Sequence, residues 1–433
     1  MPLLDTDREL TKDSYYAATA ARGAAFAPLS GSTRCDVAIV GGGLAGLSAA
    51  IELRRQGLDV VLLEAREIGF GASGRNGGQA IHGLACDQDV IEAQLGLEDA
   101  RRVWQMSIEA LDLIRSRIAE FAIDCDWQDG YLGLATSAGK GRALAEWADR
   151  IDTVYGYPLT RVAPADVGRW IASPRFHSGI HDPRSGHLHP LKYTLGLARA
   201  AAAAGVRLYE GTPVSALQPG PEPLLRTPVG DVRARHVLLA GNVYLQGLAP
   251  ALAPRIMPVG TYIACSETLD PARADALIPS RSAVCDTDFV LDYFRPTPDH
   301  RMLYGGRVSY STVTPGDLAE SMRRRMVKTF PQLSDVKIRY AWGGFVDISM
   351  NRAPDFGRLA GSANVYYLQG FSGHGLALTG LAGRLVAEAI GGNASRFDVF
   401  ARLKHRPFPG GALLRTPALV LGMAWYRLRD MLG

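Results

Sequence analysis

The sequence has few cysteines, and their spacing excludes several classes of protein. Five cysteines occur in 433 residues and no two of them have the CxxC spacing; they are Cys35, Cys86, Cys125, Cys265 and Cys285. Small secreted domains and zinc sites use paired or closely clustered cysteines. We therefore expect reduced thiols, a cytoplasmic location and no metal site.

The sequence also has little net charge and no block of basic residues. Its formal net charge is +4, and its densest basic stretch, MRRRM (322–326), falls inside an expected helix. Such a stretch is typical of a solvated helix face rather than of a nucleic-acid contact. The GxSxG, HExxH and P-loop motifs are absent. Nucleic acid is therefore not an expected partner.

Long hydrophobic runs are absent as well. The first thirty residues contain acids and tyrosines such as Asp5, Glu9 and Tyr15, and they lack the basic end and apolar core of a secretion signal. Near the C-terminus, ALVLGMAWY (418–426) is apolar, but it has about half of the roughly 20 residues that span a bilayer. We interpret it as a packed tail with at most a weak membrane contact.

A strong signal for a βαβ unit lies near the start of the chain. The composition is that of a globular protein, with 47% apolar and 21% charged residues, and the length favours two domains. An apolar run at 36–40 is followed by a glycine turn, by apolar residues at helical spacing and by a second run at 60–63. This order predicts strand, helix and strand.

The residues of this unit are suited to a dinucleotide. Gly41 permits the tight turn, Gly43 lets the backbone approach a pyrophosphate, and Gly46 lets the helix pack on the strand. The helix N-terminus attracts the phosphates, and Glu64 can accept hydrogen bonds from a ribose. An acid at this position disfavours the 2′-phosphate of NADP, whereas NAD and FAD both fit the unit.

A second glycine-rich stretch follows the second strand and favours FAD. The loop FGASGRNGGQ (70–79) allows a ribityl chain and a flavin ring to approach the backbone closely. Arg75 and Asn76 offer hydrogen-bond donors to phosphate or ring oxygens. The alternative is a mobile surface loop with no ligand.

A third glycine turn, QGFSGHG (369–375), leads from a strand into a helix. Its helix N-terminus can stabilise the negative charge that collects on a flavin ring on reduction, and His374 can add a donor. The alternative is an ordinary helix start with a packed histidine.

Three further polar positions are less informative. His82 either borders the flavin ring or packs in the protein core. Arg352 either anchors the substrate or forms a surface ion pair. The two histidines of GHLHP (186–190) lack the neighbouring ligands of a metal site.

The chain resembles the D-amino-acid oxidase-like flavoproteins, which include glycine and sarcosine oxidases, and within them it most resembles the gamma-glutamylputrescine oxidases. The likeness covers nearly the whole chain and rests on SYYAATA (14–20), VGGGLAG (40–46), GFGASGRNGGQ (69–79), SGHLHPLKY (185–193), LAGNVYL (239–245), NVYYLQGFSGHG (364–375) and FPGGALLRTP (408–417). The segment WGGFVDISMNRAPDFGR (342–358) departs from the pattern, which leaves the exact amine open.

The resemblance implies a fold and a set of cofactor contacts. The fold is α/β, with a doubly wound Rossmann-type FAD-binding domain (34–85, 182–250 and 345–395) and a mainly antiparallel substrate domain (86–181 and 251–344). An N-terminal extension (1–33) and a C-terminal tail (396–433) complete it. The implied FAD contacts are Gly41, Gly43, Leu44, Ala45, Gly46, Glu64, Ala65, Arg66, Ser73, Gly74, Arg75, Asn76, Gly77, Gly78, Gln79, Val214, Gly241, Ser372, Gly373, His374, Gly375 and Leu376.

The resemblance also implies an activity. A neutral amine or amino-acid substrate passes a hydride to flavin N5, the imine hydrolyses, and dioxygen reoxidises the flavin to give hydrogen peroxide. Some sarcosine oxidases bind flavin through a cysteine near 342–358, and no cysteine follows Cys285, so noncovalent FAD is expected. The substrate-side candidates are Tyr262, Trp342, Arg352, His374 and His82.

Two alternatives stay open at this point, and the oligomeric state is not predicted. One is a D-amino-acid or N-methyl amino-acid dehydrogenase that passes electrons to the respiratory chain. The other is a flavin-binding sensor or subunit without turnover. The three intact glycine turns favour an enzyme over the second alternative.

Overall fold

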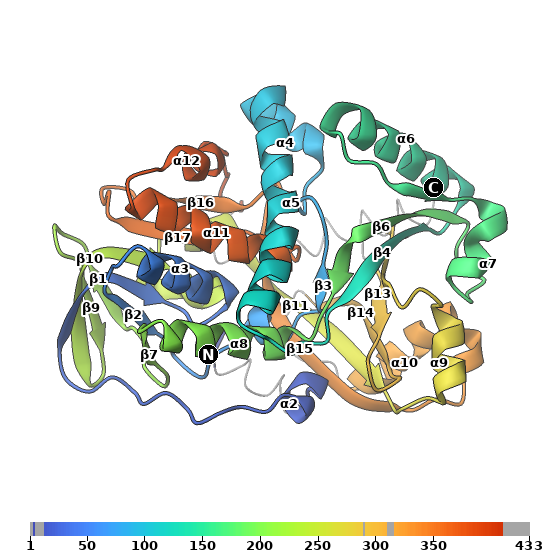
Figure 1. Cartoon of the computed structure of the whole chain (residues 1–433), viewed down its shortest axis with the longest axis horizontal. Coiled ribbons are helices and arrows are strands. Elements are labelled where there is room, and N and C mark those ends of the chain that lie inside the picture. Colours follow the sequence, from blue (N-terminus) through green and yellow to red (C-terminus); the bar gives the residue numbers. More distant parts are fainter. Residues whose placement is uncertain (1–2, 5–12, 289–290, 310–315, 410–433) are drawn as a thin grey trace.

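The described residues form two β-sheets that lie side by side. The computed structural model describes residues 3–4, 13–288, 291–309 and 316–409. The first sheet has eight strands and lies on the left in Figure 1, and the second has nine strands and lies on the right. This confirms the predicted α/β class with a second, mainly antiparallel part.

The first sheet has a parallel centre. Its strands lie in the order β16 (Asp355–Arg358), β17 (Val365–Gln369), β10 (Gly230–Leu239), β1 (Thr33–Val40), β2 (Val60–Leu63) and β7 (Arg207–Tyr209), with β8 (Ala216–Gln218) and β9 (Leu224–Thr227) attached beside β10. All neighbours from β17 to β7 pair in parallel. Parallel strands are buried on both faces, which is why they read as continuous apolar runs.

Helices cover this sheet and extend between the two parts. They are α3 (Leu44–Arg55), α4 (Gln88–Leu95), α5 (Leu97–Glu120), α8 (Pro190–Ala203), α11 (Gly375–Ile390) and α12 (Ser395–Ala401). Helix α11 packs closely on α3, because a Cβ at Gly383 would lie 2.5 Å from the carbonyl oxygen of Ala45. Gly96, whose φ is +81°, separates α4 from α5.

The second sheet is mainly antiparallel. Its strands lie in the order β15 (Ile338–Ser349), β11 (Ile256–Ser266), β14 (Met302–Ser309), β13 (Tyr293–Pro296), β12 (Ala283–Asp286), β4 (Gln128–Ala135), β6 (Ser178–His187) and β3 (Gln79–Ala80), and β5 (Thr160–Val162) pairs with β6. Within this second sheet, β12 and β4 are the only described neighbours that pair in parallel. The helices of this part are α6 (Ala138–Tyr155), α7 (Val167–Trp170), α9 (Pro271–Leu277) and α10 (Leu318–Thr329).

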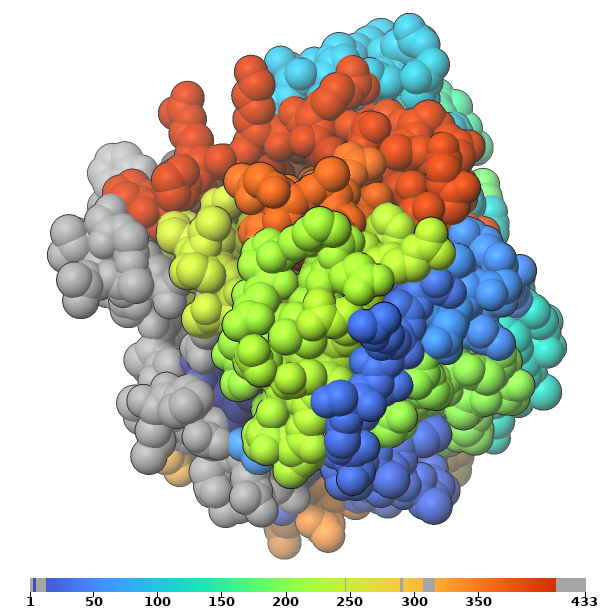
Figure 2. Space-filling model, turned by 90° about the vertical axis from the view of Figure 1, so that its left-hand side faces the viewer, coloured from blue at the N-terminus to red at the C-terminus, as the bar shows by residue number. Residues whose placement is uncertain are grey.

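The N-terminal segment follows the outside of the first sheet. Helix α2 (Tyr15–Thr19) buries Tyr15 and Tyr16. Residues 26–31 then run across the face seen in Figure 2, where the blue segment lies against the green one. The backbone nitrogen of Phe26 donates to Glu210 Oε2 at 2.8 Å, and that of Gly31 donates to the carbonyl of Val229 at 3.1 Å. Residues 26–31 thus pack against the first sheet.

The chain crosses between the sheets several times. The sequence assigned 182–250 and 345–395 to the FAD-binding domain. The starts of these ranges fall inside β6, which ends at His187, and β15, which ends at Ser349, and both strands belong to the second sheet. The domain boundaries stay a prediction. Among the described residues, no helix is long and apolar enough to cross a membrane. The apolar tail 418–426 lies outside the described residues.

Candidate active site

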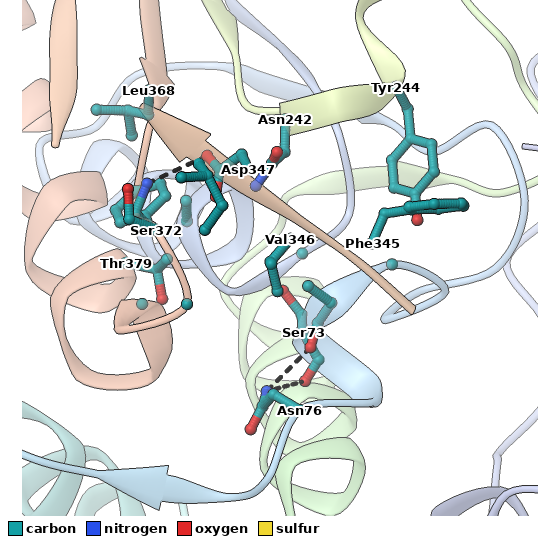
Figure 3. Close-up of a pocket in the computed structure, with 18 of the residues that line it drawn as sticks. Ser73, Asn76, Asn242, Tyr244, Phe345, Val346, Asp347, Leu368, Ser372 and Thr379 are labelled. Atoms are coloured by element: carbon teal, nitrogen blue, oxygen red, sulfur yellow. Dashed lines mark hydrogen bonds between the residues drawn. The ribbon is translucent and has the colours of Figure 1, made fainter. Parts of the chain in front are cut away.

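A large cavity lies where the two sheets meet. Its volume is about 1650 Å³, and all three glycine-rich stretches of the sequence contribute to its wall. Further wall segments come from 212–215, 240–248 and 345–352. Figure 3 shows side chains from these separate segments pointing into one space. Segments far apart in the sequence therefore form a single site.

The first glycine turn forms one end of the cavity. Gly41 has a φ of +115°, and a Cβ there would lie 2.7 Å from the carbonyl oxygen of Ala240. A Cβ at Gly43 would lie 2.7 Å from Ser73 Oγ, and that hydroxyl accepts the N–H of Leu44 at 3.0 Å. The start of α3 and the second loop therefore touch each other in the cavity wall.

Glu64 is fixed at the end of β2 by two backbone bonds. Its Oε2 accepts the N–H of Gly42 at 2.7 Å, and its Oε1 accepts the N–H of Arg66 at 2.8 Å. Burial raises the pKa of this carboxyl, and the two backbone N–H groups oppose that rise. Each carboxylate oxygen has a second lone pair, so the group can still accept a hydroxyl from a ligand.

The second loop uses its polar side chains to hold its own shape. Asn76 Nδ2 donates to the carbonyl of Ala72 at 2.9 Å, and Asn76 Oδ1 accepts the N–H of Gly78 at 2.8 Å. The Arg75 guanidinium lies 4.3 Å from the centre of the Phe70 ring, and this arginine is 6% exposed. Arg75 lies outside the cavity wall, whereas Asn76 is part of it.

The third turn is anchored by a buried acid that the sequence analysis did not single out. The side chain of Asp347, a β15 residue labelled in Figure 3, accepts the N–H groups of Gly370 and Phe371. It is 2% exposed and lines the cavity. Burial raises its pKa to about 6, although these N–H groups and Asn242 oppose the rise. The available signal was a lone acid within the otherwise apolar stretch GGFVDIS (343–349).

His374 caps α11 and lines the cavity. Its Nε2 lies 2.9 Å from the carbonyl oxygen of His82 and 3.3 Å from that of Ile81. A carbonyl can only accept, so the proton of the neutral ring is on Nε2. Burial lowers the pKa of His374, and the ring is therefore neutral at pH 7.

The His82 ring lies behind the cavity wall. Its Nδ1 is 2.7 Å from Asp182 Oδ2, and the ring is surrounded by Trp104, Trp147 and Tyr157. Burial acts to raise the pKa of Asp182, but the hydrogen bond and charge of His82 outweigh it and hold that pKa well below its usual range. The structure thus gives His82 a packing environment and brings only its backbone near His374.

The other substrate-side candidates occupy different places. Arg352 lines the cavity, between β15 and β16, with a φ of +57°. Tyr262 and Trp342 are each 1% exposed and lie outside the wall. Trp342 Nε1 donates to the carbonyl of Arg75 at 3.0 Å, so this tryptophan supports the second loop from behind.

Tyr293 is a wall residue that sequence reasoning missed. Its ring occupies space left by two glycines: a Cβ at Gly77 would lie 2.6 Å from the ring, and a Cβ at Gly305 only 2.1 Å from it. Burial raises the pKa of the phenol above its usual range, so the hydroxyl is protonated. Cys285 also lines the cavity, and its thiol donates to Gln79 Oε1 at 2.9 Å. No motif in the sequence marks either residue.

Most of the predicted cofactor contacts are in the wall. Those that line the cavity are Gly41, Gly43, Leu44, Ala45, Glu64, Ala65, Ser73, Asn76, Gly77, Gln79, Val214, Gly241, Ser372, Gly373, His374, Gly375 and Leu376. Those outside it are Gly46, Arg66, Gly74, Arg75 and Gly78. Gly46 has the packing role expected of it, because a Cβ there would lie 3.2 Å from Ile39 Cγ2.

The arrangement fits a flavin dinucleotide. Bare backbone at Gly41 and Gly43 forms a cradle that any Cβ would narrow. A fixed carboxylate stands at one end, and the N-terminus of α11 stands at the other. A helix N-terminus favours negative charge, and the cavity joins two of them. These are the groups that a ribose, a pyrophosphate and a flavin ring require.

Comparisons with known proteins agree with this geometry. The family model "FAD dependent oxidoreductase" matches residues 36–389. The chain is 44% identical to the gamma-glutamylputrescine oxidoreductase of Escherichia coli (strain K12), covering 97% of this chain and 98% of that protein. It is 38% identical to a probable oxidoreductase, OrdL, of Haemophilus influenzae, covering 96% and 97%.

Solved structures share the fold. The glycine oxidase from Geobacillus kaustophilus matches with a TM-score of 0.71 at 20% identity, covering 84% of this chain and 96% of that one. An L-amino acid deaminase from Proteus vulgaris matches with a TM-score of 0.71 at 16% identity, covering 87% and 99%. From the family match and the relatives, the chain belongs to the FAD dependent oxidoreductase family and is an FAD-dependent amine or amino-acid oxidoreductase.

Proposed function

We propose that this enzyme oxidises a C–N bond in an amine or amino-acid derivative, with gamma-glutamylputrescine as the first substrate to test. The observation that supports the proposal most is the continuous cavity from Glu64 to Tyr293 and His374. The 44% identity to a gamma-glutamylputrescine oxidoreductase over 97% of the chain supports the choice of amine.

The two helix starts and Glu64 would hold the cofactor. Glu64 would bind the ribose of the adenosine half, and the N-terminus of α3 with Ser73 would bind the pyrophosphate. The third turn and α11 would face the reactive end of the ring, where their N–H groups stabilise negative charge. Bound FAD would supply the acceptor for two electrons and one proton taken from the carbon beside the amine nitrogen.

We propose that the flavin is bound without a covalent link. The segment 342–358 has no cysteine. The two cysteines in the cavity wall, Cys86 and Cys285, have thiols whose pKa burial raises, and so they stay protonated. A protonated thiol is a poor nucleophile. Acid precipitation of the holoprotein should therefore leave all of the flavin in the supernatant.

The substrate side would work by positioning and by excluding water. Tyr293, Phe345 and Met257 form an apolar wall there, and removal of water favours the neutral form of an amine. Neutral His374 would orient the substrate through its unprotonated Nδ1, since its Nε2 is engaged with backbone carbonyls. Arg352 would bind a carboxylate where the substrate has one.

One experiment tests the proposal. Separate samples of the purified protein are mixed under anaerobic conditions with one compound each: gamma-glutamylputrescine, putrescine, sarcosine, glycine or D-alanine. The loss of flavin absorbance is followed in each sample. We expect bleaching by gamma-glutamylputrescine and peroxide release when air is admitted. Bleaching followed by reduction of a dye but not of dioxygen would instead support a dehydrogenase. Bound flavin that no amine bleaches would contradict the proposed oxidation.

A further inference from the structure

A buried arginine, Arg295, forms no ion pair with an acid of the described residues and lies behind the second glycine-rich loop (70–79). Arg117 and Arg295 are the two most buried arginines among the described residues, with 0% and 2% of their surface exposed. Arg117 forms an ion pair with Glu52 at 2.9 Å. Within the described part of the chain, no carboxylate lies within 4.0 Å of Arg295 in an ion pair. Buried charges are normally paired because desolvation is costly, so Arg295 requires an explanation.

Among the described residues, the hydrogen-bond partners of Arg295 are all neutral groups. Its Nε donates to the carbonyl of Gly77 at 2.9 Å. Its Nη2 donates to the carbonyl of Leu188 and to the hydroxyl of Tyr16, both at 3.1 Å. Its Nη1 lies 3.4 Å from His187 Nδ1 and from the carbonyl of Pro296. The guanidinium is hydrogen-bonded, but no carboxylate of the described residues forms an ion pair with it.

The histidines and the tyrosine next to Arg295 are uncharged at pH 7, so they do not offset its positive charge. Burial, with Arg295 as the next cause, lowers the pKa of His187 and that of His189 to about 3, so both rings are neutral at pH 7. Burial raises the pKa of Tyr16, so its hydroxyl is protonated. Asp299, the nearby acid that acts on His189, is already bonded to Tyr15 and Arg301. The two histidines of GHLHP therefore belong to the neutral surroundings of a cation.

The guanidinium lies immediately behind the cavity wall. Gly77, whose carbonyl it binds, lines the cavity, and so does Tyr293, two residues before Arg295. A Cβ at Gly78 would lie only 2.8 Å from Arg295 Nη2, so glycine at this position allows the close approach. One peptide unit of the second loop separates the charge from the space assigned to the flavin.

We infer that Arg295 raises the reduction potential of the bound flavin. The inference rests on the proposed function. Oxidation of the amine moves two electrons and one proton, as a hydride, from the substrate carbon to the ring; the substrate becomes a protonated imine, and the ring gains one negative charge. A fixed positive charge in a medium of low dielectric constant stabilises that added charge. Arg295 touches neither substrate nor ring and acts through the loop, as a positioning residue with an electrostatic effect.

The test compares the reduction potential of the bound flavin in variants at position 295. In Arg295→Gln, the ratio of reduced to oxidised flavin at a fixed potential, set against a reference dye, should fall at least tenfold. A tenfold change corresponds to about 30 mV for a two-electron couple. Arg295→Lys keeps the charge and should stay within threefold of the parent. Arg117→Gln, which removes an arginine that has an acidic partner, is the matched control and should leave the ratio unchanged.

A second pair of variants avoids removal of the arginine. His187→Glu places a carboxylate beside Arg295 Nη1 and should lower the ratio of reduced to oxidised flavin by a similar factor. His187→Gln, whose new side chain has the shape of glutamate without its charge, should leave the ratio unchanged. This pair decides the question if Arg295→Gln does not fold. An unchanged potential in Arg295→Gln and His187→Glu would overturn the inference, as would equal losses in the lysine and glutamine variants. A parent protein that binds no FAD would instead overturn the proposed function.

Discussion

The two ends of the cavity differ in how the sequence encodes them. The nucleotide end is built from one βαβ unit, β1 to β2, and its key groups are backbone atoms at Gly41 and Gly43 together with Glu64. The reactive end combines side chains from β13, β15 and the start of α11. A sequence motif predicts local backbone geometry, but it does not predict which side chains come together through tertiary packing.

The strongest way to sharpen this contrast is to test Asp347, which no motif marks. Its pKa is raised to about 6, chiefly by burial, so the folded state holds the proton more tightly than the unfolded chain. Its ionisation therefore costs stability, with no cost below about pH 4 and the full cost above pH 6. At 1.36 kcal/mol per pKa unit, the cost is about 3 kcal/mol.

We therefore expect wild-type holoprotein to lose about 3 kcal/mol of unfolding free energy relative to Asp347→Asn between pH 4 and pH 7. Urea denaturation at several pH values measures this difference. Asp182→Asn is the control with the opposite sign in a lower pH window: the pKa of Asp182 is held low, so its contribution is complete above about pH 4 and is lost only as the pH falls below that value. A difference between wild type and Asp347→Asn that does not vary with pH would show that Asp347 keeps an ordinary pKa.

The nucleotide end is tested by Gly43→Val. The new side chain would enter the space beside Ser73 Oγ and hold a phosphate away from the backbone. Overpacking of this kind costs up to about 3 kcal/mol, so FAD should bind about a hundredfold more weakly. Titration of the apoprotein with FAD measures the change.

Gly168→Val is the matched control, because a Cβ at Gly168 meets no atom within 4 Å. It should leave FAD affinity as in wild type. Equal FAD affinities in Gly43→Val and wild type would mean that the phosphates do not approach this turn. The assignment of the nucleotide end to the first βαβ unit would then be wrong.

At the reactive end, His374→Ala should lower kcat about tenfold while flavin content stays constant. The substitution removes one oriented polar contact, and a contact of about 1.4 kcal/mol corresponds to a factor of ten. Turnover with gamma-glutamylputrescine and absorbance of the bound flavin are measured on the same samples. A large loss of flavin with normal kcat per flavin would move His374 from the substrate side to the cofactor side.

The smallest effect is expected at Arg352. Arg352→Met should raise KM about fivefold, equivalent to about 1 kcal/mol, for a substrate with a carboxylate. It should leave KM unchanged for an amine without a carboxylate, such as putrescine. Steady-state kinetics with both substrates give the answer. Equal changes for the two amines would indicate a general effect on the cavity wall rather than recognition of a carboxylate.

Sequence patterns located the first βαβ unit and the three glycine-rich stretches that line the cavity. The runs at 36–40 and 60–63 became β1 and β2, and the turn at 369–375 joins strand β17 to helix α11 as predicted. Strand β15, one of the longest, was not recognised, because Gly343 and Gly344 interrupt its apolar pattern. Its pairing with β11, from Ile256 opposite Ser349 to Ser266 opposite Ile338, holds it in an extended conformation.

Side-chain roles were predicted less well than backbone roles. Arg75 was expected to offer a donor to the cofactor, yet its guanidinium lies over Phe70 outside the cavity wall. Tyr262 and Trp342 were expected beside the substrate and are buried in the packing around the site. Conversely, Tyr293 and Asp347 line the cavity without any motif. Which way a side chain points depends on sheet register and on neighbours that are distant in the sequence.

The sequence by itself determined the cofactor class and the α/β architecture, because glycine turns, apolar periods and a terminal acid act through local backbone geometry. Only the tertiary structure decided that Asp347 anchors the third turn, that Tyr293 enters the wall, and that Arg295 lies behind Gly77 with no acidic partner in the described part of the chain. The reason is physical: burial and charge compensation are properties of the assembled neighbourhood, and a linear chain does not specify them residue by residue.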